Sequence, residues 1–327
     1  MSTILLETVL GTSGRFKFSF SENGRYGTCL RTNRADLVLE SWTFSAEEAR
    51  SRTIPDVVVD AETCALPLDD GRIVVLRTSK GNPSQTHALA LFQPREDDFC
   101  WEWLGAISSL FGAYLLPSPS VSHLGFVVAL DSGHSTIWRL STSPPRIEIV
   151  AQVPGFLRGG VWLDGDANIL AVNQTCGRYP SNGIAVDLTH GSWKQIWSRS
   201  VTSADQILLG SAQSKMIIFA TTTSGEERIG WAVLDDWTVH FPGILHRPGY
   251  ERRAVALDDR GERLLVREVV GEMSRLFIYT PADDSLVSIA GAPGTISSPA
   301  CWTGNFIRCR FSAPAQPSTL ATLRLTP

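Results

Sequence analysis

A short unit recurs through the whole chain: a turn rich in Asp, Asn and Gly leads into an apolar strand. Five clear copies and two weaker ones lie directly before residues 26–32, 73–78, 125–131, 169–174, 216–221, 263–268 and 306–311. Equivalent strand positions in successive copies are 42 to 54 residues apart, about 47 on average. A period of about 40 to 50 residues is typical of the four-stranded blade of a β-propeller.

Each unit also contains the other strands that a blade needs. In the sixth unit, the expected strands are residues 250–257, 263–268, 274–279 and 286–289. No long stretch of the chain keeps the apolar spacing of an amphipathic helix. The sequence therefore predicts an all-β protein, a single domain over residues 1–327 that forms a seven-bladed β-propeller of four-stranded blades. A two-sheet sandwich is the alternative, but it does not account for a period sustained along the whole chain.

The seventh unit ends one strand short. Its three expected strands are residues 297–302, 306–311 and 319–325, whereas the apolar residues 3–10 belong to no N-terminal blade. We expect the ring to be closed by this N-terminal strand pairing into the last blade, because the pairing removes two open sheet edges that would favour aggregation.

Composition excludes several classes of function. The chain has 33 acidic and 29 basic residues and a net charge of -4, without the basic excess that binding to nucleic acid requires. No apolar run approaches the roughly 20 residues of a membrane span, and the N-terminus lacks the features of a signal peptide. We therefore expect a soluble, cytoplasmic protein with no nucleic acid partner and no membrane association.

The cysteine and histidine residues predict neither a metal site nor a cofactor site. The six cysteines form no CxxC pair, and the six histidines are scattered along the chain. Such cysteines are typically free thiols in a reducing compartment. We expect no metal and no cofactor.

The turn between the first and second strands of a unit resembles that of the propeller of the prolyl oligopeptidase family. Residues 66–75 and 161–170, which read LPLDDGRIVV and VWLDGDANIL, are most similar to it. The chain lacks the signatures of WD, kelch and Asp-box repeats. The resemblance implies a propeller that, in that family, is fused to an α/β-hydrolase domain carrying the catalytic Ser, Asp and His.

No segment of the chain fits the nucleophile elbow of such a hydrolase. The elbow requires G-x-S-x-G, and neither residues 133–137 nor residues 11–15 fit this spacing. The chain ends where the hydrolase domain would begin. We expect the fold of the family without its serine peptidase activity.

The candidate site lies where the innermost strands of the blades would line a central channel. Charged residues there must be paired, hydrated or bound to a ligand, because an isolated buried charge is costly. The candidate catalytic residues are Arg158, Asp205, Glu251 and Arg253. The candidate ligand-binding residues are Lys17, Tyr114, Trp162, Gln206, Tyr250, Arg252 and Trp302.

We expect most of these residues to meet in one pocket at a channel mouth, because the inner strands of neighbouring blades converge on one axis. Strand alternation allows either Tyr250 with Arg252 or Glu251 with Arg253 to face the channel. Mutual pairing is the alternative for the charges, with Glu251 bonded to Arg158 or Arg253. Packing between blades is the alternative for the aromatic residues, including Phe111, which is also expected on an inner strand.

Three functions remain open. The first is a stand-alone propeller that binds a small organic or peptide-like ligand in its channel, either as a binding protein or as a non-hydrolytic cyclase, isomerase or lyase of a biosynthetic pathway. The second is a non-catalytic interaction or scaffold module that partners a separate hydrolase through a propeller face. The third is the propeller fragment of a longer peptidase. The mixed charged and aromatic residues of the inner strands favour the first.

Overall fold

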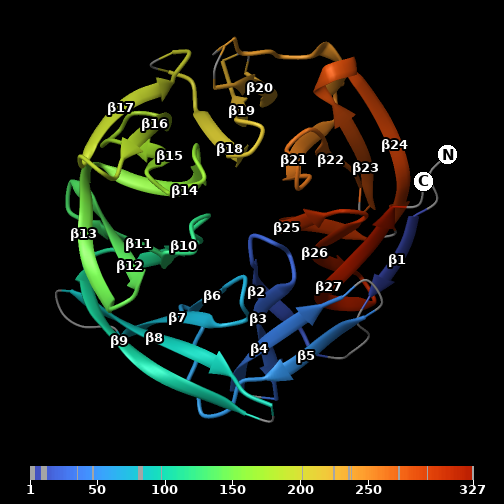
Figure 1. Ribbon diagram of the computed structural model, residues 1–327. Helices are drawn as coiled ribbons and strands as arrows, with labels where there is room; N and C mark the ends of the chain where they lie inside the picture. The colour runs from blue at the N-terminus through green and yellow to red at the C-terminus, as the bar shows by residue number, and fades with distance from the viewer. Residues whose placement is uncertain are drawn as a thin grey trace.

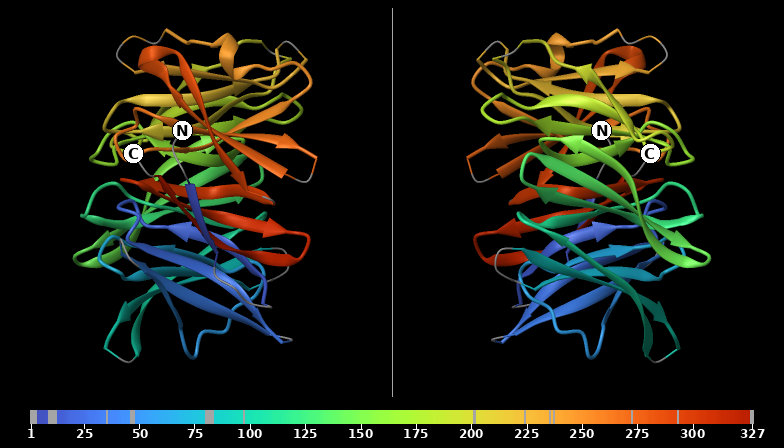
Figure 2. Two further views of the ribbon diagram at one scale, coloured as in Figure 1. Left: turned by 90° about the vertical axis from the view of Figure 1, so that its right-hand side faces the viewer. Right: turned by 90° about the vertical axis from the view of Figure 1, so that its left-hand side faces the viewer.

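The structure, a computed structural model, is a ring of seven antiparallel sheets (Figures 1 and 2). It describes residues 4–8, 13–34, 36–45, 48–79, 84–96, 98–200, 202–223, 225–234, 236, 238–271, 273–292 and 294–325. The predicted all-β class and the seven-bladed propeller are confirmed.

The blades follow one another in chain order, each running from the innermost strand outwards. Blades one to three contain β2 (Arg15–Phe20), β3 (Tyr26–Asn33), β4 (Asp36–Phe44) and β5 (Ala49–Thr53); β6 (Cys64–Pro67), β7 (Ile73–Ser79), β8 (Gln85–Pro94) and β9 (Phe99–Ser109); and β10 (Ala113–Leu116), β11 (His123–Asp131), β12 (His134–Thr142) and β13 (Pro145–Pro154). Blades four and five contain β14 (Phe156–Trp162), β15 (Ile169–Thr175), β16 (Asn182–Asp187) and β17 (Ser192–Trp197); and β18 (Asp205–Ser211), β19 (Met216–Thr221) and β20 (Arg228–Val233). Blades six and seven contain β21 (Glu251–Leu257), β22 (Leu264–Val270), β23 (Met273–Thr280) and β24 (Ser285–Ala292); and β25 (Thr295–Thr303), β26 (Phe306–Ala313), β27 (Gln316–Leu325) and β1 (Ile4–Thr8). The two short 3₁₀ helices are η1 (Gly243–Leu245) and η2 (Pro281–Asp283).

The second strand of each blade forms the core, because neighbouring blades cover both of its faces. All six residues of β19 are buried, and so are Val74 to Leu76 in β7. These are the apolar runs that follow the recurrent turn in the sequence. A strand buried on both faces reads as a continuous apolar run rather than an alternating one.

The recurrent Asp residues stabilise the turn between the first and second strands. The Asp164 carboxylate accepts hydrogen bonds from the backbone N–H groups of Asn168 (2.9 Å) and Ile169 (3.2 Å). Asp258 accepts those of Glu262 (2.7 Å) and Arg263 (3.0 Å). The side chain thus satisfies backbone donors that the turn leaves unpaired, which explains why these positions are acidic.

Blade five differs from the expected four-stranded pattern, since the described residues give it only β18, β19 and β20. The place of a fourth strand is taken by a single bridge, in which His240 exchanges backbone hydrogen bonds of 2.8 and 2.9 Å with Trp231. Pro242 follows two residues later and has no N–H to extend the pairing. The prediction of four strands per blade is wrong here.

The N-terminal strand β1 lies beside β27 at the circumference of the ring (Figure 1). The two strands are antiparallel, with Ile4 opposite Leu325 and Thr8 opposite Ala321. Among the described residues, no helix is long and apolar enough to cross a membrane.

Deletion of residues 1–11 should lower the melting temperature by several degrees or cause aggregation. The deletion removes β1 and leaves the edge of β27 unpaired, at about 0.5–1.5 kcal/mol for each backbone hydrogen bond lost. Thermal unfolding and light scattering of the truncated and intact chains measure the effect. A soluble truncated protein that melts like the intact chain would contradict it.

Candidate functional site

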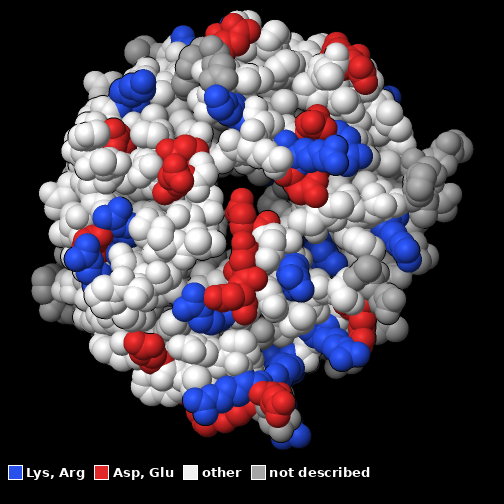
Figure 3. Space-filling model, in the orientation of Figure 1, with Lys and Arg blue, Asp and Glu red and all other residues white. Residues whose placement is uncertain are grey.

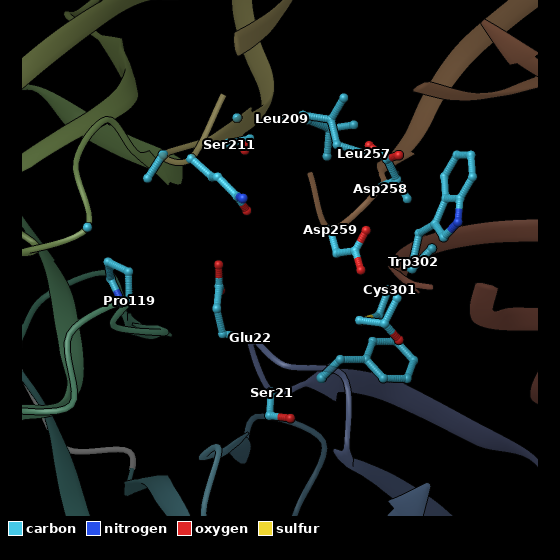
Figure 4. Close-up of a pocket in the computed structure, with 18 residues that line it drawn as sticks. Ser21, Glu22, Pro119, Leu209, Ser211, Leu257, Asp258, Asp259, Cys301 and Trp302 are labelled. Atoms are coloured by element: carbon cyan, nitrogen blue, oxygen red, sulfur yellow. The ribbon is translucent and has the colours of Figure 1, made fainter. Parts of the chain in front are cut away.

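A cavity of about 570 Å³ lies at one mouth of the central channel, where the innermost strands end and turn outwards. We call it the turn-side cavity. It is lined by residues 20–22, 209–213, 256–259 and 300–303, with Pro119 and Gly165. Figure 3 shows acidic side chains beside the central opening of the ring, and Figure 4 shows the cavity itself.

Glu22 stands in the turn that follows β2, and this turn is tightly fixed. Within the turn, the Gly24 N–H donates to the Ser21 carbonyl oxygen (2.9 Å). Gly24 has a φ of 64°, and a Cβ at this position would lie 2.7 Å from Thr303 Cγ2. Glycine is therefore required here both by the backbone conformation and by the close approach of blade seven.

The Glu22 carboxylate points into the turn-side cavity (Figure 4). No ion pair to Glu22 is found among the described residues. Glu22 is exposed to the cavity, yet the protein around it at the channel mouth restricts hydration of the carboxylate, and the nearby Asp69 carboxylate repels its charge; both effects raise the pKa of Glu22. Glu22 is thus an uncompensated acidic group that holds its proton more readily than an ordinary glutamate.

Two further carboxylates come from the turn after β21, and they differ in role. Asp258 is buried and pairs with Arg263 (2.8 Å) while it stabilises its own turn. Asp259 accepts a hydrogen bond from the Gly304 N–H through Oδ2 (3.2 Å) and lines the cavity from blade six, whereas Glu22 lines it from blade one (Figure 4). Glu22 and Asp259 are therefore the two carboxylates available to a ligand.

Apart from Gln213, the remaining walls are apolar or small. Trp302 is 2% exposed; its indole N–H donates to the Gly304 carbonyl oxygen (3.1 Å), and the Arg263 guanidinium lies 4.8 Å from the ring centroid. Burial is the main reason that the pKa of the Cys301 thiol is raised to about 11. Cys301 is therefore a neutral thiol near pH 7 and is not an activated nucleophile.

Five predicted residues lie at the beginning of innermost strands, near the opposite mouth of the channel. Exposed side chains there are Lys17, Arg158, Gln206, Glu251 and Arg253. Glu251 and Arg253 form an ion pair with each other, and the Lys17 ammonium donates to the Thr63 carbonyl oxygen (3.3 Å). Each of these residues precedes the lining of the turn-side cavity by three residues or more, at about 3.3 Å per residue, and none of them belongs to that lining.

Two other predicted charged residues are built into the fold. Asp205 is fully buried, and its carboxylate accepts hydrogen bonds from Ser203, from Thr221 and from the Arg199 N–H. Arg252 is bonded to the buried Glu268 (2.8 Å). The hydrogen-bonding capacity of both groups is thus used within the protein and is not available to a ligand.

The predicted aromatic residues mostly connect blades. Tyr114 O–H donates to the Gly159 carbonyl oxygen (3.1 Å), and Trp162 N–H donates to that of Pro117 (2.7 Å). Tyr250 lies under the Arg247 guanidinium, 4.0 Å from its ring centroid. Phe111, expected on an inner strand, instead precedes β10 and is 57% exposed.

The residues predicted to form one pocket are therefore not brought together in the turn-side cavity. Among the predicted site residues, Trp302 alone belongs to its described lining. Sequence reasoning missed Glu22 and Asp259 because both stand in the recurrent turn, where an acidic residue is expected for structural reasons. Their signal was their position: a turn after an innermost strand borders the channel.

Other catalytic arrangements are not supported by the described residues. They contain no group of three or more His, Cys, Asp or Glu side chains placed to hold a metal ion. Ser135, in the segment closest to an elbow motif, is fully buried and its hydroxyl donates to the Gly155 carbonyl oxygen (2.8 Å). Residues 11 and 12 of the other such segment lie outside the described residues.

The sequence matches no protein-family model and no curated protein. Solved structures are similar in fold. A prolyl endopeptidase superposes with a TM-score of 0.68 at 12% identity, over 96% of this chain and 50% of the endopeptidase. This chain therefore spans about half the length of the endopeptidase. The β-propeller domain of the Trilobed protease from Pyrococcus furiosus gives 0.67 at 11% identity, over 96% and 97%. An oligogalacturonate lyase in complex with manganese gives 0.69 at 8% identity, over 99% and 97%. The chain thus has the propeller fold seen in prolyl oligopeptidases and in an oligogalacturonate lyase.

The variant Glu22→Gln should be more stable than the native protein at pH 7. The pKa of Glu22 is raised in the folded protein. The native chain therefore loses stability as the pH rises from the pKa of Glu22 in the unfolded chain, about 4.5, through its pKa in the folded protein. The amide is free of this loss, so its advantage should disappear near pH 4.

Chemical denaturation of both proteins at pH 4 and pH 7 measures the difference. Glu102→Gln, on the outer strand β9, is the matched control, because it removes the same charge from an exposed side chain away from the channel. A Glu22→Gln protein that is equal to or weaker than the native chain at pH 7 would contradict the argument.

Proposed function

We propose that the protein binds a small organic or peptide-like ligand carrying a positive charge in the turn-side cavity. One observation carries the proposal: Glu22 and Asp259 both line the cavity, from blades one and six, and neither forms an ion pair with a described residue. A cationic ligand would supply the missing charge. An ammonium or guanidinium group that bonds to a carboxylate gives one of the stronger hydrogen bonds available in proteins.

The size and walls of the cavity support a small ligand. Its volume of about 570 Å³ is in the range typical of small-molecule sites. Leu209 and Leu257 are half-buried and provide apolar surface beside the two carboxylates, with the buried Trp302 packed in the same wall. The ligand would therefore combine a cationic group with an apolar part.

Glu22 also supports acid–base chemistry on such a ligand. A carboxyl group with a raised pKa keeps its proton to a higher pH than an ordinary glutamate, and it can both donate and accept a proton. We propose a non-hydrolytic reaction of the cyclase, isomerase or lyase type in a biosynthetic pathway, with Glu22 as the proton-transfer group. An oligogalacturonate is an anion, so the acidic cavity favours a different substrate for this chain.

The predicted residues at the opposite mouth remain candidates for a further contact. Arg158 is exposed there and forms no ion pair within the described residues, so it would suit an anionic group of a longer ligand. The described cysteines are all free, which supports a reducing, cytoplasmic setting.

Binding of 2-phenylethylamine, with 2-phenylethanol as its uncharged analogue, tests the proposal. The amine should bind the native protein at low ionic strength, and the alcohol should bind much more weakly. Glu22→Gln with Asp259→Asn should weaken binding of the amine about tenfold or more, because two charged acceptors are lost. Titration calorimetry or ligand-observed NMR measures the affinities.

Glu102→Gln is the control, since it changes the net charge far from the channel. Equal binding of the amine and the alcohol, or a double variant that binds the amine like the native protein, would defeat the proposal.

An interaction module is the second candidate, because two large aromatic side chains are exposed on the outer strand of blade two. Trp101 and Trp103 are 63% and 56% exposed on β9. Exposed tryptophan is enriched in protein interfaces. A partner protein would therefore dock on this side of the ring rather than at the channel.

The variant Trp101→Ser with Trp103→Ser distinguishes the two functions. If the protein is a module, quantitative pull-down from its native cell extract should lose a partner with this variant and retain it with Glu22→Gln. The same partners for all three proteins would count against the module, and binding of 2-phenylethylamine should not change.

A further inference from the structure

We infer that Asp69, on the neighbouring blade two, is a positioning residue for Glu22: it holds the turn that carries Glu22 and places a second carboxylate beside it. The inference rests on the proposed function, in which Glu22 is the group that meets the ligand. It adds a residue that lies outside the turn-side cavity and belongs to another blade.

The contact between the two blades is made through Asn23, the residue next to Glu22. The Asn23 backbone N–H donates to Asp69 Oδ1 (2.9 Å), and the Asn23 side-chain amide donates to the Asp69 carbonyl oxygen (3.1 Å). Two bonds to one residue fix both the distance and the orientation of the turn. Asp69 thus acts on Glu22 from one side, while Thr303 and Cys301 pack against Gly24 from the other.

Asp69 differs from its neighbour Asp70 in how its charge is compensated. Asp70 forms an ion pair with Arg72 (2.7 Å) and accepts the Arg72 N–H (3.0 Å). Asp69 has no ion pair among the described residues. Two adjacent aspartates in one turn therefore have separate roles: Asp70 is neutralised locally, and Asp69 leaves its negative charge beside Glu22.

Glu22 lines two neighbouring cavities. Besides the turn-side cavity, it lines a second cavity of about 220 Å³ between blades two and three, to which Asp69 belongs. The titratable and charged groups around it are Asp69, Asp70, Arg72 and His123 on that side, and Asp258, Asp259 and Cys301 on the other. Asp69 is the one whose charge acts on Glu22 strongly enough to raise its pKa, after the effect of restricted hydration.

Three variants separate the two effects of Asp69. Asp69→Asn retains an oxygen that accepts the Asn23 N–H but removes the charge, whereas Asp69→Ala removes both. Asp70→Asn is the matched control, because it removes the same charge one residue away. The carboxyl signal of Glu22, assigned with Glu22→Gln, is titrated by ¹³C NMR in each protein without ligand.

We expect the pKa of Glu22 to fall in Asp69→Asn and to change much less in Asp70→Asn. In Asp69→Ala we also expect faster hydrogen exchange of the Asn23 amide and weaker binding of 2-phenylethylamine. Equal shifts in the two Asn variants, or no shift in either, would overturn the inference, and so would unchanged exchange of the Asn23 amide in Asp69→Ala. Because the titration needs no ligand, it can succeed where the binding experiment fails, and the two proposals are tested separately. Thermal unfolding of each variant shows that it is folded.

Discussion

The structure depends on the packing of neighbouring blades against each other. A blade is a small sheet with two apolar faces, and it can bury both only between two other blades. Leu116 and Phe126 of blade three share one hydrophobic cluster with Val172 and Ile184 of blade four. Val255 of blade six is in a cluster with residues of blade seven in the same way. A ring meets this requirement for every blade, since it has no first or last face.

This packing leaves the turns free to carry polar groups at the channel. The turns are nevertheless rigid, because hydrogen bonds join them from blade to blade: Asn23 to Asp69, Gly304 to Asp259 and Trp162 to Pro117. A rigid turn can hold a carboxylate where solvation is poor and a like charge is close, which a flexible loop would avoid by moving away. Such an unfavourably placed acid is characteristic of functional sites.

The comparisons separate the fold from the chemistry. At 8 to 12% identity, a prolyl endopeptidase, a protease propeller domain and an oligogalacturonate lyase share the same ring. The shared element is the apolar packing between blades, which many sequences satisfy. In this chain, the channel mouth carries Glu22 and Asp259, which line the cavity, and Asp258, which is neutralised by Arg263. Function must therefore be argued from that mouth.

The sequence by itself determined the architecture, because each blade is specified locally by a turn, a buried strand and the strands that follow within about 47 residues. Blade five is the exception to the four-stranded pattern, because a single bridge at His240 replaces its fourth strand while the spacing of the repeat in the sequence stays the same. The site was decided only by the tertiary structure. Asp205 reads as a channel charge, yet it is turned into a buried hydrogen-bond network, whereas Glu22 reads as a turn residue and reaches the cavity. The physical reason is that the meeting of side chains at the axis depends on how seven strands are placed around it, and on which partner neutralises each charge; neither is encoded within any one repeat.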